Sequence, residues 1–166
     1  MGSPSAVGIL FLSIRGRINF LQLARHSDAY EESTCRLQFE QYMDFASLNQ
    51  HYLQEKGSGH YVLAFDLSYL PKSGKATPGA GHYWSGAAQR SLWGLEVGVL
   101  SAIDMGHYTA FHLDAIQTPA STERAAKGID LVDHYAQAIL WCCPKVASLS
   151  AYLAVDAYFA KGEFIG

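Results

Sequence analysis

The hydrophobic pattern of the chain changes abruptly at Lys56-Gly57-Ser58-Gly59, and this break most constrains the fold. Before it, residues 17–55 favour helix, and Asp28-x-x-Glu31 resembles a capping box. The apolar residues that repeat at three- and four-residue steps, as on one face of a helix, are Phe39, Tyr42, Phe45, Leu48 and Tyr52. Glycine after a terminal lysine is typical of a helix end. The pattern therefore predicts an N-terminal helical segment over residues 1–56.

After the break, short apolar runs typical of strands alternate with loops. The predicted elements are strands at 60–67, 93–103, 108–116 and 150–155, a long loop at 68–90, and a helix at 129–141 stopped by Pro144. Three consecutive strands followed by a crossover helix imply a right-handed connection into a parallel fourth strand. Residues 60–166 are therefore expected to form an α/β domain with a mixed sheet, in the order of the first half of a ribonuclease H-like fold.

The composition excludes several classes of protein. Hydrophobic residues make up 49% and charged residues 16% of the 166 residues, which favours a folded core over disorder. No apolar run approaches the roughly 20 residues of a membrane span, so no membrane partner is expected. The three cysteines have neither a disulfide framework nor zinc-site spacing, and we expect a reducing cytoplasm.

The charge distribution leaves two interpretations open. A net charge of −3 counts against a nucleic-acid-binding protein. However, residues 1–27 and 67–95 contain basic residues and no acidic ones, so they could contact DNA phosphates. The candidate DNA-binding residues are Arg15, Arg17, Arg25, Lys72, Lys75 and Arg90. The alternative is that these residues are ordinary solvated surface.

Two aspartates occupy equivalent places in the predicted strands. Asp66 follows the apolar run VLAF, and Asp156 follows YLAV. If the two strands are parallel neighbours about 4.8 Å apart, both carboxylates emerge at one edge of the sheet. Carboxylate oxygens suit Mg²⁺ or Mn²⁺, and such ions promote phosphoryl transfer. The alternative is that each aspartate merely ends a strand and faces solvent.

Several blocks of the sequence, in order, carry a family resemblance. They are Gly16–Ser27, Ala64–Gly86, Trp93–Asp104, Thr109–Pro119 and Val155–Lys161. Together they resemble bacterial insertion-sequence transposases with an Asp-Asp-Glu (DDE) catalytic domain. The resemblance implies metal-dependent DNA cleavage and strand transfer at transposon ends, with Asp66 and Asp156 as catalytic metal ligands for Mg²⁺ or Mn²⁺. It also implies DNA as partner (transposon ends and target), a homo-oligomer, and a place in the bacterial cytoplasm with the nucleoid.

The chain departs from the family pattern in its third catalytic acid. That glutamate lies well downstream of the second aspartate in the family, whereas Glu163 is the only acid here after Asp156 and is too close to it. We therefore expect the third acid beyond residue 166 and no catalysis by this chain alone. A non-enzymatic alternative is a truncated remnant that binds only DNA or the full-length transposase.

Other residues of the central region allow more than one role. Lys72-Ser73-Gly74-Lys75 is not a phosphate-binding P-loop, because Tyr69 and Ala76 replace the required glycine and Ser/Thr. The aromatic residues Tyr83, Trp84 and Trp93 could stack on a DNA base or fill the core. Asp104 and Asp114 could assist the site, although turn and surface roles are simpler. His112 is expected to be structural.

Overall fold

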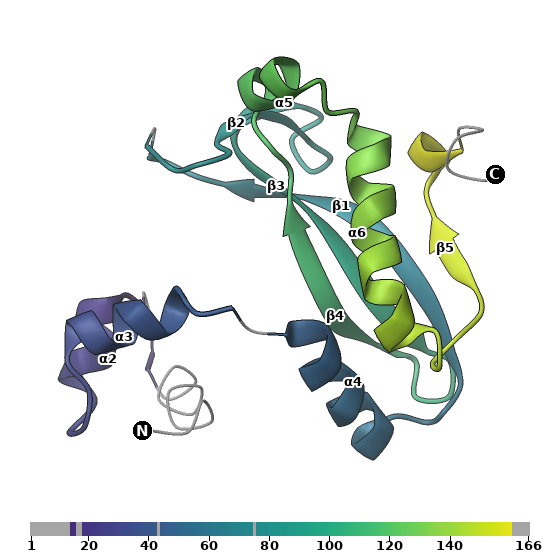
Figure 1. Cartoon of the computed structure of the whole chain (residues 1–166), viewed down its shortest axis with the longest axis horizontal. Helices are drawn as coiled ribbons and strands as arrows, with labels where there is room; N and C mark the ends of the chain where they lie inside the picture. Colours follow the sequence, from purple (N-terminus) through teal and green to yellow (C-terminus); the bar gives the residue numbers. More distant parts are fainter. Residues whose placement is uncertain (1–13, 16–17, 43, 75, 161–166) are drawn as a thin grey trace. The chain divides into compact units, whose positions relative to one another are not determined.

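The computed structural model describes residues 14–15, 18–42, 44–74 and 76–160 (Figure 1). The chain divides into two compact units, residues 1–43 and 44–166. The first contains α2 (Phe20–Arg25) and α3 (Glu32–Phe39), which pack through a small core of Ile14, Leu23 and Cys35. Asn19 caps α2, because its side chain accepts a hydrogen bond from the Gln22 N–H at 2.9 Å.

The predicted capping box at 28–31 is wrong. The Ser27 hydroxyl accepts hydrogen bonds from the N–H groups of Ala29 and Tyr30, at 3.2 and 3.0 Å, and forms a turn. α3 starts with Glu31 as its N-cap and has no side-chain cap bond. A short hydroxyl side chain that captures nearby N–H groups competes with helix, which explains why the helical segment is broken here.

The second unit is built around a five-stranded mixed sheet. Its strands are β1 (Tyr61–Pro71), β2 (Gly81–Ser85), β3 (Arg90–Asp104), β4 (Thr109–Gln117) and β5 (Leu153–Val155). β3 pairs antiparallel with β1, β2 and β4, and β5 pairs parallel with β1. The four predicted strands and the parallel fourth strand are thereby confirmed, as is an α/β fold with a mixed open sheet.

The long loop predicted at 68–90 is wrong in two places. β1 continues to Pro71, and β2 forms a hairpin with the beginning of β3, from Gly81 opposite Gly94 to Ser85 opposite Arg90. Along β2, buried and exposed side chains alternate over only five residues. So short an alternation, among many glycines, is too weak a signal to distinguish a strand from a loop.

Two helices connect β4 to β5: α5 (Ser121–Lys127), which the pattern did not predict, and α6 (Leu131–Val146). α5 has no buried residue and hence no apolar periodicity to detect. The predicted stop at Pro144 is wrong, because α6 continues through it to Val146. Proline removes one helical hydrogen bond there. The last turn is held by the burial of Val146 and by a 2.8 Å hydrogen bond from Lys145 Nζ to Asp44.

α4 (Phe45–Lys56) belongs to the second unit, where it packs against β4 and α6. It ends before Gly57, as predicted, but its buried residues are Ala46 and Leu53. The predicted apolar face is wrong, because its residues in both units are more than half exposed: Phe39, Tyr42, Phe45, Leu48 and Tyr52. A helix that contacts its neighbours along a narrow stripe buries only the residues of that stripe, so its other apolar residues stay exposed.

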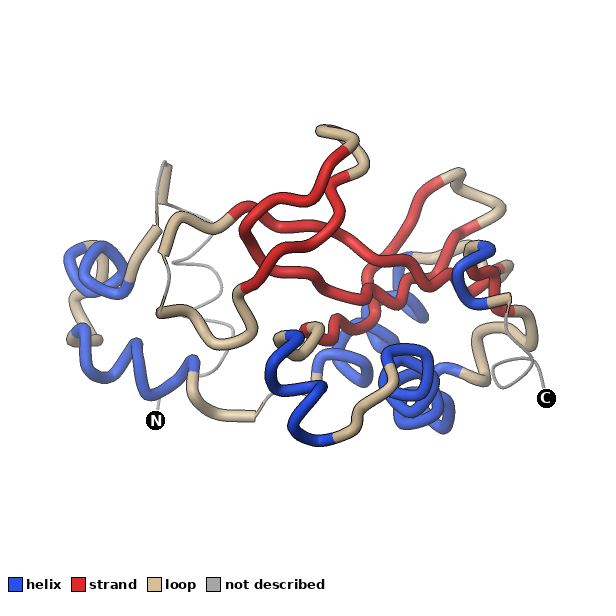
Figure 2. The backbone as a smooth tube through the Cα atoms, turned by 90° about the horizontal axis from the view of Figure 1, so that it is seen from above, coloured by secondary structure: helices blue, strands red, loops and turns tan. Residues whose placement is uncertain are grey.

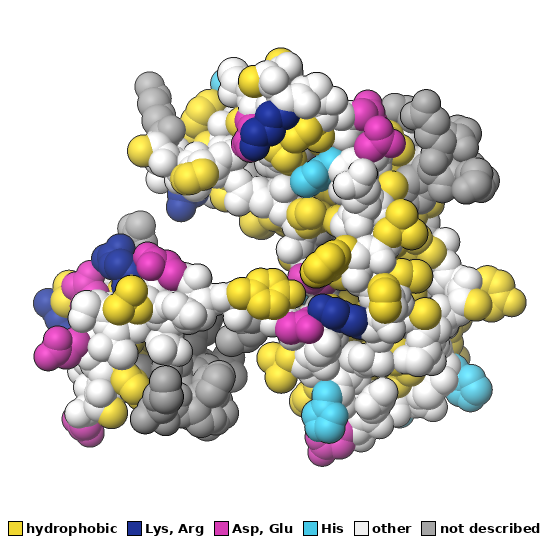
Figure 3. All heavy atoms as spheres, in the orientation of Figure 1, with side chains coloured by type: hydrophobic (Ala, Val, Ile, Leu, Met, Phe, Trp, Pro, Cys, Tyr) yellow, Lys and Arg dark blue, Asp and Glu magenta, His cyan; other side chains and the backbone are white. Residues whose placement is uncertain are grey.

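The main core lies between the sheet and α6, and α4 and α6 lie on the same side of the sheet (Figure 2). The Phe65 ring lies 5.4 Å from that of Tyr135 and 5.5 Å from that of Phe159. Gly98 permits this packing, because a Cβ there would approach both the Phe65 and Tyr135 rings within 3 Å. Figure 3 shows hydrophobic side chains at the surface over α6. Leu140 and Trp141 of this helix are exposed. None of the helices in the described ranges is both long and apolar enough to cross a membrane.

Candidate functional site

Asp66 and Asp156 follow directly on the last residue pair of the two parallel strands. Phe65 pairs with Val155 in the register of β1 and β5, and each aspartate is the next residue along its strand. The strands are adjacent and parallel, as the sequence predicted. Since neighbouring strands lie about 4.8 Å apart, the backbones at the two aspartates lie side by side.

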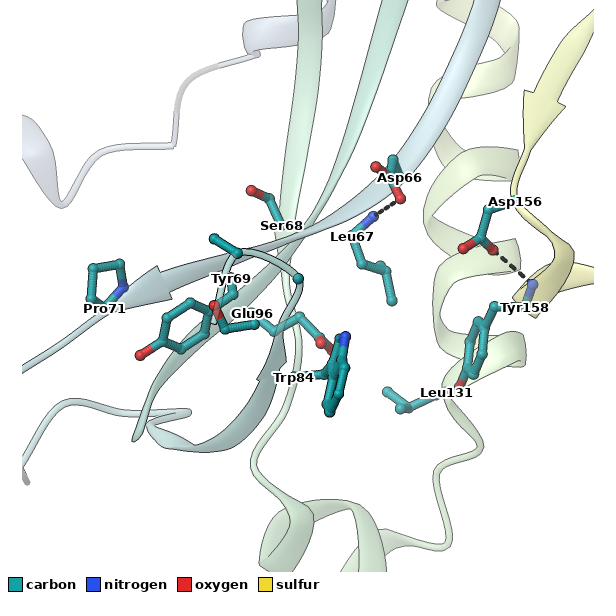
Figure 4. A pocket seen from close by; sticks show the side chains of 13 residues that line it. Asp66, Leu67, Ser68, Tyr69, Pro71, Trp84, Glu96, Leu131, Asp156 and Tyr158 are labelled. Carbon is teal, nitrogen blue, oxygen red and sulfur yellow. Dashed lines mark hydrogen bonds between the residues drawn. The ribbon is translucent and has the colours of Figure 1, made fainter. Parts of the chain in front are cut away.

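Both aspartates are exposed, and each is oriented by a single backbone N–H group (Figure 4). Asp66 Oδ1 accepts from the Leu67 N–H at 2.8 Å, and Asp156 Oδ1 accepts from the Tyr158 N–H at 2.7 Å. Within the described ranges, the second oxygen of each carboxylate accepts no hydrogen bond. One oxygen of each side chain is therefore available to a ligand.

The segment after β5 is anchored by the core. Asp156 is the N-cap of the short 3-10 helix η1 (Ala157–Phe159). Phe159 is completely buried and packs against Phe65 and Tyr135. The same aromatic cluster thus fixes the backbone on both sides of the carboxylate pair.

The two aspartates open into a cleft of about 870 Å³. Its lining combines β1, β2, β3, the beginning of α6 and the segment after β5: Asp66, Leu67, Ser68, Tyr69, Pro71, Trp84, Ser85, Gly86, Ala87, Glu96, Leu131, Asp156 and Tyr158. Figure 4 shows the two aspartates at one end and Trp84 and Glu96 at another. The cleft is therefore larger than the carboxylate pair needs by itself.

Glu96 lines this cleft, and the sequence analysis missed it. Its Oε1 accepts hydrogen bonds from the Thr118 hydroxyl at 3.0 Å and from the Tyr135 hydroxyl at 3.4 Å. Burial, with the nearby Glu96 charge, raises the pKa of Tyr135 well above its ordinary value, so this hydroxyl stays a neutral donor. The one available signal was an acid in the middle of the apolar strand WGLEVGV.

The donor set at the aspartate pair fits a hard divalent cation in part. In the described part of the chain, no three His, Cys, Asp or Glu side chains form a group that could hold a metal ion. Mg²⁺, however, is commonly bound by one or two carboxylates together with water and substrate phosphate oxygens. Two carboxylates from neighbouring strands, each with an oxygen available, meet that requirement. Glu163 lies outside the described residues.

The predicted DNA-binding residues fall into two groups. Lys72 follows β1 and Arg90 begins β3; both are exposed, at the end of the sheet where Pro71 pairs with Gly94. In the first unit Arg15 and Arg25 are exposed. Arg17 and Lys75 lie outside the described residues. The structure thus brings two of the six predicted cations to the sheet end that also carries β2.

The three candidate stacking residues differ in how far their rings are exposed. Tyr83 is buried and its hydroxyl donates to the Gly79 carbonyl at 2.8 Å. Trp93 is partly buried and its Nε1 donates to the Gly74 carbonyl at 3.2 Å, which fixes the loop after Lys72. Trp84 is 59% exposed and lines the cleft. Trp84 alone of the three offers its ring to a ligand.

The other polar candidates make contacts within the protein. Asp104 is completely buried and accepts hydrogen bonds from Ser58, Gly106 and His107. Asp114 accepts from its neighbour's N–H and from the Cys142 thiol. His112 is exposed, and its Nδ1 lies 3.1 Å from the Ser101 hydroxyl. None of these aspartates lines the cleft.

Comparison with known proteins brings no significant match to a protein family model, to a curated protein or to a solved structure. The functional interpretation therefore rests on the geometry of the cleft and on the sequence motifs.

Proposed function

We propose that the chain belongs to the catalytic domain of a DDE transposase, which cleaves DNA at transposon ends and transfers the strand to target DNA with the help of Mg²⁺ or Mn²⁺. The observation that carries the proposal is the placement of Asp66 and Asp156 one step beyond the Phe65–Val155 pair. Two carboxylates on adjacent parallel strands, opening into one cleft, suit a cation that also contacts phosphate.

The sheet topology supports the same proposal. The order β4-β3-β1-β5, with three antiparallel strands and a fourth parallel to β1 after a helical crossover, is that of the first half of a ribonuclease H-like sheet. The β2 hairpin is then an insertion between the first two strands of that sheet. In open α/β sheets, ligands bind near the carboxyl ends of the parallel strands. Asp156 follows the end of β5, and Asp66 follows the last β1 residue that pairs with β5.

Each part of the cleft has a role in this reaction. Asp66 and Asp156 hold the cation through their available oxygens. When bound, the cation activates the attacking oxygen and stabilises the leaving oxygen of a phosphodiester. The family resemblance implies a third carboxylate, and Asp66 and Asp156 are the two of that set that line the cleft.

The exposed cations near β2 supply the DNA contacts. Lys72 and Arg90 carry no acidic partner among the described residues, since the ion pairs found there involve other side chains. Phosphate contacts by lysine and arginine position a duplex without reading its sequence. The cleft is thereby flanked by positive charge although the chain is acidic as a whole.

The salt dependence of DNA binding tests this proposal. For each phosphate contact, the slope of log affinity against log salt changes by about 0.9. We expect Lys72→Ala and Arg90→Ala each to reduce the slope by roughly that amount in fluorescence anisotropy titrations with a short duplex. Lys56→Ala is the matched control, because Lys56 pairs with Glu55 at the end of α4. No binding at low salt, or equal slopes for all four proteins, would refute the proposal.

A further inference from the structure

Arg124 carries a positive charge that no acidic side chain of the described residues neutralises. It belongs to α5 and is partly buried, and its Nε is buried without a hydrogen-bond partner in the described part of the chain. The ion pairs found there involve other side chains. Arginine cannot lose its proton to relieve the cost of burying a charge. Such a guanidinium is suited to an anion from outside the protein.

The other cation of the same helix is neutralised within α5. Lys127 donates to Glu123, one turn away, at 2.7 Å. Glu123 is the only acidic residue among Ser121–Lys127, and α5 has no fully buried residue. The net positive charge of this helix therefore resides on Arg124.

Arg124 lies close enough to β2 to act on Tyr83. The pKa of the Tyr83 hydroxyl is raised, chiefly by burial and further by the Glu96 charge, and the Arg124 charge opposes this rise. The Tyr83 hydroxyl donates to a backbone carbonyl, and Glu96 Oε1 accepts from two hydroxyl groups. Neither group pairs with Arg124, so its guanidinium stays available next to β2.

The pairing of β2 with β3 places Arg90 on the same face of the hairpin as Tyr83. Ser85 lies opposite Arg90 and Tyr83 lies opposite Leu92, and residues two apart in a strand face the same side. At about 3.3 Å per residue, Tyr83 is only about 7 Å along β2 from the Ser85–Arg90 pair. Two arginines that are distant in sequence, Arg90 and Arg124, thereby flank one face of β2.

We infer that Arg124 binds a backbone phosphate of DNA next to the phosphate contacted by Arg90, so that the DNA strand crosses β2 on the side of α5. This inference rests on the proposed DNA-processing function and adds a direction to its DNA path. The planar guanidinium matches two phosphate oxygens at once. The charge pattern of the sequence did not mark Arg124, because Glu123 precedes it.

The test measures how salt affects duplex binding by the full chain in fluorescence anisotropy titrations. Arg124→Met keeps the apolar stem of the side chain and removes the charge. It should reduce the slope of log affinity against log salt by about 0.9, as the loss of one phosphate contact does. Arg124→Lys keeps the charge and should retain the wild-type slope. Lys127→Met is the matched control on the same helix and should also retain it, because Lys127 is paired with Glu123.

Thermal unfolding separates a phosphate contact from a structural role. Because the Arg124 side chain has no partner in the described ranges, Arg124→Met should unfold at the wild-type temperature or above it. A clear decrease would assign Arg124 to the stability of the fold and overturn the inference.

Inorganic phosphate distinguishes a DNA phosphate from a free phosphate ion. Stabilisation of the wild type, but not of Arg124→Met, by inorganic phosphate at constant ionic strength, together with an unchanged DNA slope, would show a site for the free ion and overturn the inference. Equal slopes for the wild type and both methionine variants, or equal reductions in both variants, would also overturn it and leave the proposed function standing. Absence of DNA binding at low salt would overturn both.

Discussion

One end of the β1–β3 ladder and the place where β5 stops pairing with β1 both carry aspartates, and they use them in opposite ways. At one end Asp104, opposite Tyr61, is completely buried, and both of its oxygens accept hydrogen bonds from the protein. Where β5 stops pairing with β1, Asp66 and Asp156 are exposed, and each accepts a hydrogen bond from one backbone N–H. A carboxylate saturated by protein donors contributes to stability, whereas one with an available oxygen can serve a ligand.

The electrostatics of Asp104 follow from its donors. Burial alone would raise its pKa, but the hydrogen bonds from the Ser58 hydroxyl and N–H, and from the N–H groups of His107 and Gly106, outweigh burial. The pKa of the folded state therefore lies below the ordinary value of 3.8. Asp104 ties the β3–β4 turn to the segment between α4 and β1, and it does so as a charged group.

The largest expected effect comes from exchanging the two kinds of aspartate for alanine. Asp104→Ala removes a buried carboxylate and leaves the N–H groups of Ser58 and Gly106 without their acceptor, and should lower the melting temperature by on the order of 10 °C. Asp66→Ala removes an exposed side chain and should change it by at most a few degrees. Thermal unfolding followed by circular dichroism makes the comparison. Equal losses for the two variants would abolish the distinction between the two regions.

A smaller loss of stability is expected when the pH is lowered. Because folding lowers the pKa of Asp104, its contribution to stability is present above about pH 4 and is lost as the pH falls through the folded-state pKa. Urea unfolding at pH 6 and pH 3 should show a loss of stability for the wild type and a clearly smaller loss for Asp104→Asn. If Asp104→Asn is as acid-sensitive as the wild type, this residue is not the origin of the pH dependence.

The smallest expected effect concerns the environment of Asp114, whose two carboxylate oxygens also both accept hydrogen bonds from the protein. Burial, followed by the hydrogen bond to Asp114, raises the pKa of the Cys142 thiol to about 12, whereas Cys143 is exposed. Because the thiolate is the reactive form, iodoacetamide at pH 8 should modify Cys142 on the order of ten-fold or more slowly than Cys143. Cys143→Ser should remove the fast phase of labelling and Cys142→Ser should leave it. The opposite assignment would contradict the described environment of Asp114.

The sequence predicted those features of the fold that have a strong periodic signal. Long apolar runs identified β1, β3, β4 and β5, and the equivalent positions of Asp66 and Asp156 identified the pair that the sheet brings together. Tertiary contacts decided the rest. Lys145, Val146 and their partners carry α6 past Pro144.

Glu96 and α4 illustrate what sequence patterns leave out. The importance of Glu96 depends on Thr118 and Tyr135, which are distant in sequence, so no local pattern marks it. α4 buries Ala46 and Leu53 and exposes its larger apolar residues, because the surfaces of β4 and α6 select the face that packs. Local patterns thus locate elements more reliably than the faces and side chains that those elements use.

The central claim is that Asp66 and Asp156 together hold a divalent cation, and Mn²⁺ binding measured by electron paramagnetic resonance tests it most directly. The wild-type chain should bind Mn²⁺, and Asp66→Asn and Asp156→Asn should each weaken binding by at least about ten-fold. Glu55→Gln, which removes one negative charge at the end of α4, should bind like the wild type. Mn²⁺ affinity that is equal in all four proteins, or absent from the wild type, would contradict the account.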